Sequence, residues 1–133
     1  LTKPGARVIR SSHKFRFHVT GAISELHEDA VRWPQTEERH NLAVQSDRAY
    51  RLEGCVGLID GMHVTLFKMP TREDASGFHN RNGSYSYNVL GVVNERQEFI
   101  YVQSKYAGSW DDWSVFSASD LARKRKQYFD EGR

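Results

Sequence analysis

Apolar residues recur at helical spacing near the start of the chain. Four of them lie three or four positions apart, which places them on one face of a predicted helix over residues 21–33. They are Ile23, Leu26, Ala30 and Trp33. Pro34 ends this helix. Residues 35–50 are mostly polar, and we interpret them as a loop with one helical turn.

A short apolar run between glycines, residues 54–59, is typical of a strand that is buried on both faces of a sheet. Asp60 follows directly, so we expect its carboxylate at the rim of the sheet, with Gly61 allowing the chain to turn there. Residues 63–67 predict a second, shorter strand. Two interpretations of Asp60 remain: it caps this turn, or it belongs to a functional site.

The middle of the chain predicts an antiparallel hairpin. Residues 68–84 are rich in turn formers and predict a polar loop. Residues 85–93 begin with alternating aromatic and polar side chains and end fully apolar, and residues 99–103 form a second β-rich run. Only the polar residues 94–97 connect the end of the first run to the second, which favours a hairpin.

Two helices are predicted after the hairpin. The first begins near Asp111, which is a good N-cap residue, and turns Trp113 and Phe116 toward the core. Asp112 falls in its first turn, where the helix dipole and free amides favour an ionised carboxylate. Ser119 can cap the second helix. Strands followed by helices in this order indicate an α/β (α+β) fold.

Composition adds limits to this picture. The 133 residues are 38% hydrophobic and 27% charged, which fits one globular domain. No apolar run approaches the roughly 20 residues that a membrane span requires, so we expect no membrane partner. Cys55 is the only cysteine, which excludes an intramolecular disulfide and makes a reducing, intracellular compartment the default expectation.

Positive charge is concentrated near the two ends of the chain. Residues 1–20 contain five Lys and Arg and no acidic residue. A second cluster near the other end comprises Arg123, Lys124, Arg125 and Lys126. Such clusters suit a polyanion such as DNA, or a nuclear-import receptor. A solvated helix face explains them equally well.

Asp60 and Asp112 could meet at one edge of the predicted sheet. Hard divalent cations such as Mg²⁺ bind rigidly held oxygen ligands, commonly one or two carboxylates with water and substrate phosphate. Such ions can activate water and stabilise the leaving oxygen in phosphodiester cleavage. Two independent helix and turn caps remain the alternative explanation for these aspartates.

Three sequence blocks together resemble the PIF/Harbinger-type DDE transposases, the family of the HARBI-like nucleases. They are Gly-Leu-Ile-Asp-Gly-Met-His at residues 57–63, Asn-Arg-Asn-Gly-Ser-Tyr-Ser-Tyr-Asn-Val at residues 80–89 and Gly-Ser-Trp-Asp-Asp at residues 108–112. The resemblance covers roughly residues 30–133. It implies a ribonuclease-H-like mixed sheet with flanking helices, and divalent-metal-dependent cleavage and transfer of DNA in the nucleus.

The resemblance also implies roles for individual residues. Asp60 would be the first catalytic and metal-binding carboxylate, and Asp112 the acid of the Gly-Ser-x-x-Asp block, with Asp111 as the neighbour that could be confused with it. Mg²⁺ or Mn²⁺ would be the cofactor. DNA would be the substrate and partner, alongside a homo-oligomer or a helper DNA-binding protein. The residues expected to contact DNA are Arg81, Arg123, Lys124, Arg125 and Lys126.

The chain departs from the family pattern in two ways. Asn82 stands where the family usually has lysine, which removes a positive charge near the expected DNA path. The family also continues with a strand ending in Asp-x-Gly-Tyr and a later helix that carries the final acid, whereas this chain ends at Arg133. We therefore expect a basic, helical segment over residues 1–50 and the first part of a DDE endonuclease domain over residues 51–133, truncated at its C-terminus.

Truncation leads to an alternative function and to a physical expectation. The alternative is a non-catalytic remnant of a transposase that binds DNA or protein. The physical expectation is a bare apolar edge on the strand before Asp60, which would favour association with another chain and weaken metal binding. Three further residues each have a structural and a functional interpretation. His63 could bind the metal, Arg81 could contact phosphate and Trp110 could stack on a base, and each could instead have only a structural role.

Overall fold

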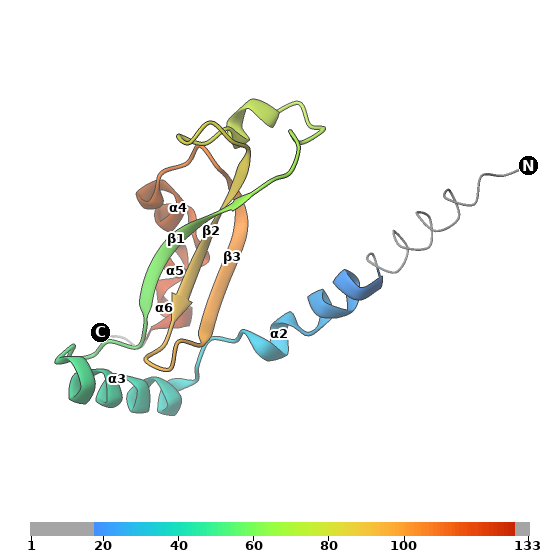
Figure 1. Ribbon diagram of the computed structural model, residues 1–133. Coiled ribbons are helices and arrows are strands. Elements are labelled where there is room, and N and C mark those ends of the chain that lie inside the picture. Colours follow the sequence, from blue (N-terminus) through green and yellow to red (C-terminus); the bar gives the residue numbers. More distant parts are fainter. Residues whose placement is uncertain (1–17, 130–133) are drawn as a thin grey trace, which may run out of the picture. The chain divides into compact units, whose positions relative to one another are not determined.

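The computed structural model describes residues 18–129 (Figure 1). Its contacts divide the chain into two compact units, Leu1–Arg32 and Trp33–Arg133, which are described separately. The basic residues predicted at positions 1–17 lie outside the described residues. The boundary predicted at residue 50 stays a prediction about the family domain.

The helix predicted near the start of the chain is confirmed, but it ends earlier than expected. Residues 18–25 are helical, and after a turn at Leu26 the helix α2 (His27–Ala30) follows. Val31 then adopts an extended conformation, with φ −124° and ψ 94°. Trp33, which we expected on the helix face, therefore belongs to the second unit.

The loop predicted over residues 35–50 is wrong, because α3 (Thr36–Tyr50) is a continuous helix. Its start is a capping box in which the Gln35 N–H donates to Glu38 Oε2 at 2.8 Å. The buried positions of α3 are the small residues Ala43 and Ser46, so its inner face has no run of large apolar side chains. A pattern search for large apolar residues therefore misses it.

A three-stranded antiparallel sheet forms the centre of the second unit (Figure 1). Its strands, in spatial order, are β1 (Leu58–Thr65), β2 (Ser86–Val93) and β3 (Phe99–Ala107). The predicted β2–β3 hairpin and the α+β class are confirmed. Between residues 18 and 129 the sheet contains no parallel strand, so the mixed pairing that the resemblance implies is not present in that part of the chain.

The hairpin turn is closed by the side chain of Asn94. Its Oδ1 accepts the N–H groups of Arg96 and Glu98, each at 3.0 Å. Its Nδ2 donates to Glu98 Oε2 at 2.9 Å. Gln97 adopts the left-handed conformation that this turn requires, with φ 64°.

The two strands predicted around Asp60 are in fact one. β1 pairs with β2 without interruption from Leu58, opposite Val93, to Thr65, opposite Ser86. Asp60 is therefore the third residue of a strand rather than its end. The prediction that this strand is buried on both faces is also wrong, because β1 is an edge strand of the described sheet and its residues are largely exposed.

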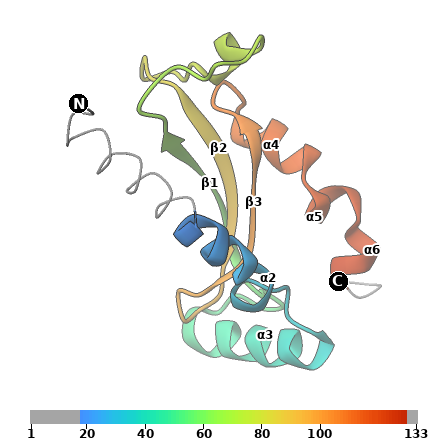
Figure 2. The same cartoon turned by 90° about the vertical axis from the view of Figure 1, so that its right-hand side faces the viewer.

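Three short helices cover one face of the sheet (Figure 2). They are α4 (Asp112–Ala118), α5 (Asp120–Arg123) and α6 (Arg125–Tyr128). The polar connection between β1 and β2 contains only the short 3₁₀ helix η1 (Ala75–Phe78). No helix among the described residues is both long and apolar enough to cross a bilayer.

The core lies between the sheet and these helices. One cluster joins Leu90 and Tyr106 to Val115, and a second joins Val92 and Ile100 to Leu121. Burying an aliphatic side chain of this size stabilises a fold by about 1.5–3 kcal/mol, so these contacts hold α4 and α5 in place.

The aromatic residues expected in this core behave differently from one another. Trp113 is 74% exposed, so its predicted inward position is wrong, and Val115 fills the core instead. Trp33 packs edge-on against Tyr128 and Phe129, and its Nε1–H donates to the Tyr128 carbonyl at 2.7 Å. The end of α6 is thereby fixed to the segment that leads into α3.

Candidate functional site

Both predicted site aspartates have a carboxylate oxygen close to Gly61. One oxygen of Asp60 accepts the N–H of Gly61 at 2.8 Å, so this carboxylate bends along β1 toward the glycine. The Asp112 carboxylate occupies the space where a side chain at position 61 would lie. A Cβ added to Gly61 would be 3.1 Å from Asp112 Cγ and closer still to Asp112 Oδ1. The prediction that Gly61 forms a turn is therefore wrong: a glycine is needed here because the carboxylate of Asp112 takes the place of a side chain.

The strand and the helix position the two carboxylates in different ways. Neighbouring residues of a strand project to opposite faces, so Asp60 and Gly61 begin on opposite faces of β1. Asp112 reaches the helix-covered face from the first residue of α4. Both carboxylates are on exposed residues, which leaves them accessible to a substrate.

Asp111 and Asp112 have separate roles in the structure. Asp111 is the N-cap of α4: its Oδ1 accepts the Ser114 N–H at 2.8 Å and its Oδ2 accepts the Ser114 hydroxyl at 2.9 Å. These hydrogen bonds, with a smaller contribution from Arg81, hold the pKa of Asp111 below its usual 3.8. Asp112 forms no hydrogen bond or ion pair with another residue of the described part of the chain, so its carboxylate is available for binding.

Asn88 on β2 lies beside this pair and is fully buried. Its Nδ2 donates to the Trp110 carbonyl at 3.0 Å, just before α4 begins. Its Oδ1 has no hydrogen-bond partner and lies 3.4 Å from the Cβ position of Gly61. Sequence reasoning missed this residue, although a polar residue beside the apolar end of β2, within the second sequence block, was a signal that could have identified it.

His63 and Ser86 form a neighbouring polar cluster. His63 Nδ1 lies 3.1 Å from Ser86 Oγ, which also accepts a hydrogen bond from Asn80 Nδ2 at 2.9 Å. Gly108 packs directly against Ser86, where a Cβ would collide with its backbone and hydroxyl oxygens. These contacts connect the loop before β2 and the end of β3 to β1. His63 therefore has a structural contact in this cluster.

The predicted DNA-contacting residues are all exposed. Arg81 lies close enough to Asp111 to affect its pKa, which places it near the start of α4. The cluster of residues 123–126 spans the end of α5 and the start of α6, farther along the chain of short helices than α4 (Figure 1). Within that cluster Lys124 Nζ pairs with Asp120 Oδ2 at 3.2 Å. The structure therefore brings Arg81, and not this cluster, near the N-cap residue of α4.

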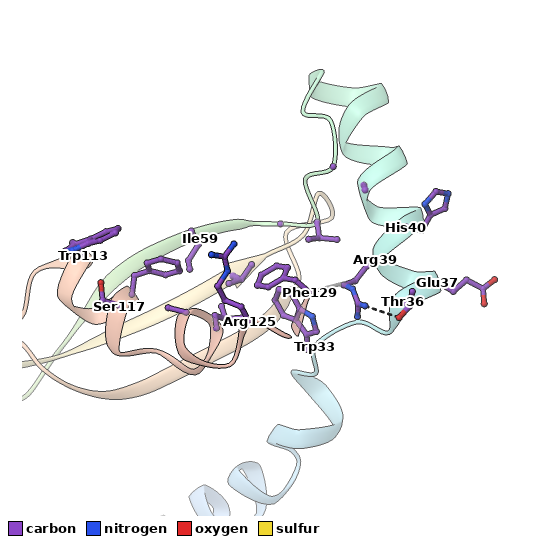
Figure 3. Close-up of a pocket in the computed structure, with 18 residues that line it drawn as sticks. Trp33, Thr36, Glu37, Arg39, His40, Ile59, Trp113, Ser117, Arg125 and Phe129 are labelled. Carbon is purple, nitrogen blue, oxygen red and sulfur yellow. Dashed lines mark hydrogen bonds between the residues drawn. The ribbon is translucent and has the colours of Figure 1, made fainter. Parts of the chain in front are cut away.

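A separate apolar groove of about 1230 Å³ lies between α3, the sheet and the later helices (Figure 3). Its walls include Trp33, Ile59 and Phe129, with Arg39 and Arg125 at its polar positions. Arg39 is fixed in part by a 2.9 Å hydrogen bond from its Nη2 to the Thr36 hydroxyl. Neither Asp60 nor Asp112 lines this groove, so it is distinct from the site at Gly61.

The donors at Gly61 are all oxygens. The described part of the chain contains no group of three or more His, Cys, Asp and Glu side chains that could hold a metal ion. Two carboxylates with an unpartnered amide oxygen nevertheless match the ligands that Mg²⁺ and Mn²⁺ prefer. The residues present therefore fit a hard divalent cation better than zinc, which binds mainly nitrogen and sulfur.

Comparisons with known proteins identify a family and several relatives. The family described as DDE superfamily endonuclease matches residues 59–133, which include Asp60, Asn88 and Asp112. The human protein named "Putative nuclease HARBI1" is 32% identical over 108 residues, covering 79% of this chain and 30% of that protein. The rat and mouse proteins of the same name are 34% and 36% identical over 110 and 109 residues.

The matches cover most of this chain but less than a third of each relative. They cover 79% and 78% of this chain for the rat and mouse proteins, and the chain spans 30% of the length of each of these relatives. No solved structure shows significant similarity to it. The family match covers more than half of the chain. The chain therefore belongs to the DDE superfamily endonuclease family and carries a HARBI-like, nuclease-like domain.

Proposed function

We propose that Asp60 and Asp112 form part of a divalent-metal-dependent site that cleaves phosphodiester bonds in DNA. The observation that carries this proposal is that each has a carboxylate oxygen beside Gly61, Asp60 from β1 itself and Asp112 from the start of α4. Mg²⁺ or Mn²⁺, when bound, would activate water and stabilise the leaving oxygen. Asp60 and Asp112 would hold the ion, with Asp60 positioned by the pairing of β1 with β2 and Asp112 by the capped start of α4.

The surroundings of the two aspartates suit a nucleic acid. Arg81 is exposed near the start of α4 and can donate charge-assisted hydrogen bonds to a phosphate. Trp110 is exposed on one side and packs on Tyr106 with a ring separation of 5.6 Å, so it presents an aromatic surface on which a base could stack. The basic residues 123–126 would hold the DNA backbone farther along the helical layer.

The exposed edge of β1 suggests how further partners would join. Leu58, Met62 and Val64 are exposed on this strand, and its outer backbone groups have no strand beside them in the described sheet. Such an edge favours pairing with another strand. We propose that a second copy or a helper DNA-binding protein pairs there. If a second copy pairs there, Val64→Lys should weaken self-association of the chain, as measured by sedimentation.

Cleavage of supercoiled DNA in the presence of Mg²⁺ or Mn²⁺ tests the proposed function. We expect Asp60→Asn and Asp112→Asn each to abolish metal-dependent nicking. Asp111→Asn is the matched control, because it removes the neighbouring charge while asparagine remains a good N-cap. Nicking that survives Asp60→Asn would contradict the proposed role of this residue.

The same preparation distinguishes the non-catalytic alternative. Binding without cleavage, with an affinity that falls steeply as salt is raised, would favour a DNA-binding remnant. In that case Lys126→Ala should make the DNA affinity less sensitive to salt concentration, whereas Asp60→Asn should leave the DNA affinity unchanged. Loss of cleavage in both aspartate variants, with binding retained, supports the catalytic proposal.

A further inference from the structure

We infer that the side-chain oxygen of Asn88 is a third ligand for the divalent cation held by Asp60 and Asp112. This inference rests on the proposed function for the identity of the ion. The role of Asn88 itself follows from its burial, its orientation and its neighbours.

The orientation of the Asn88 amide is fixed by one contact. Its Nδ2 donates to the Trp110 carbonyl at 3.0 Å. The reversed orientation would place the amide oxygen against a carbonyl oxygen, and neither atom can donate a hydrogen bond. The oxygen therefore points away from Trp110 and toward Gly61 and Asp112.

The Asn88 oxygen is an unpartnered acceptor in a fully buried side chain. Buried polar atoms are nearly always hydrogen-bonded, so an exception in a functional region points to a ligand. The other two buried asparagines of the described chain show the usual behaviour. Asn94 and Asn80 each use both their amide nitrogen and their amide oxygen in hydrogen bonds within their own turns.

A second acceptor, the Asp112 carboxylate, lies in the same place as this oxygen. Asn88 Oδ1 and Asp112 Oδ1 both lie close to the point where Gly61 would carry a Cβ. No residue of the described chain pairs with the Asp112 carboxylate. A cation is the species that satisfies several converging acceptors at once, and hard cations accept an amide oxygen beside carboxylates.

Mn²⁺ titration of the whole chain, followed by the electron paramagnetic resonance of free Mn²⁺, tests the inference without relying on activity. We expect Asn88→Ala to weaken Mn²⁺ binding by about 10-fold or more, which corresponds to the loss of one ligand from a small set. Asn88→Asp keeps an oxygen at the same place and adds charge, so we expect it to bind Mn²⁺ at least as tightly as the unmodified chain. Asn94→Ala is the matched control and should leave the affinity unchanged.

The two substitutions at Asn88 separate a ligand from a purely structural residue. Both remove the hydrogen bond to Trp110, so a structural role predicts that Asn88→Asp loses Mn²⁺ affinity as Asn88→Ala does, and that result would overturn the inference. Unchanged affinity in Asn88→Ala would overturn it as well, while the proposed function would stand if Asp112→Asn still abolished binding. Mn²⁺ binding that Asp60→Asn and Asp112→Asn leave intact would instead overturn the proposed function.

Discussion

Two side-chain amides beneath the helical layer show opposite hydrogen-bonding states. Gln103 on β3 accepts three hydrogen bonds at one oxygen: from the Tyr101 hydroxyl at 2.6 Å, the Tyr106 hydroxyl at 3.0 Å and the Asp120 N–H at 3.2 Å. Asn88 on β2 accepts none. Both amides lie next to the start of a helix, Gln103 at α5 and Asn88 at α4.

The aspartates that begin these helices differ in the same way. Asp120 of α5 pairs with Lys124 and contributes its N–H to Gln103. Asp112 of α4 has no such pair within the described residues. The region around Gln103 is therefore complete without a ligand and serves the fold, whereas the region around Asn88 lacks donors for its oxygens, as expected for a binding site.

Gly61→Ala should have the largest effect on this difference. The added methyl would collide with the Asp112 carboxylate and crowd the Asn88 oxygen, so we expect a loss of stability of about 1–3 kcal/mol together with loss of Mn²⁺ binding. Urea unfolding and Mn²⁺ titration measure the two effects. Gly77→Ala is the control, because the added Cβ would lie 3.9 Å from its nearest neighbour, the Cβ of Ala107. A Gly61→Ala protein that still binds Mn²⁺ would show that the carboxylates do not need this glycine.

Gln103→Met should give a smaller loss, in stability alone. It keeps the approximate size of the side chain but removes the acceptor of two hydroxyls and one N–H, which we expect to cost about 1–2 kcal/mol because water reaches these half-buried groups. Urea unfolding checks the loss. The increase in stability on adding Mn²⁺ should remain unchanged. A reduced response to Mn²⁺ would mean that the two regions are coupled rather than separate.

Alkaline pH should give the smallest effect, again at the Gln103 region. Burial, with contributions from Tyr128 and Asp120, raises the pKa of Tyr101 from 10.0 to about 12. Because the folded protein holds this proton more tightly than the unfolded chain, its contribution to stability is complete below pH 10 and is lost as the pH rises toward about 12. Thermal unfolding across this range should show the decline, and Tyr101→Phe should reduce its slope. An equal slope in both proteins would contradict this assignment.

The elements that sequence predicted correctly are those with strong local signals. The hairpin follows from two β-rich runs and a short polar link, and Asp111 and Ser119 were identified as helix caps from residue type and position. The helix α3 was missed because its buried positions are small rather than large and apolar. Local signals thus identify elements whose own residues carry the pattern.

The errors around the site arise from tertiary contacts that local patterns do not contain. Gly61 was interpreted as a turn because glycine commonly permits one, whereas its role depends on Asp112, which is 51 positions away in the chain. The apolar residues before Asp60 predicted a buried strand, but β1 lies at the edge of the described sheet. The feature that distinguishes Asn88 is a buried amide oxygen without a hydrogen-bond partner, which depends on the tertiary structure. The roles of Asp60, Asp112 and the basic residues stay predictions.

The edge position of β1 has a consequence for the motions of the protein. Alternate backbone N–H groups of an edge strand face away from its one partner, so they exchange with solvent more easily than those of an inner strand such as β2. The strand that carries Asp60 and Gly61 is therefore expected to open at lower free energy than the β2–β3 hairpin beside it. Amide hydrogen exchange should detect that opening, and ligands that bridge β1 to α4 should slow it.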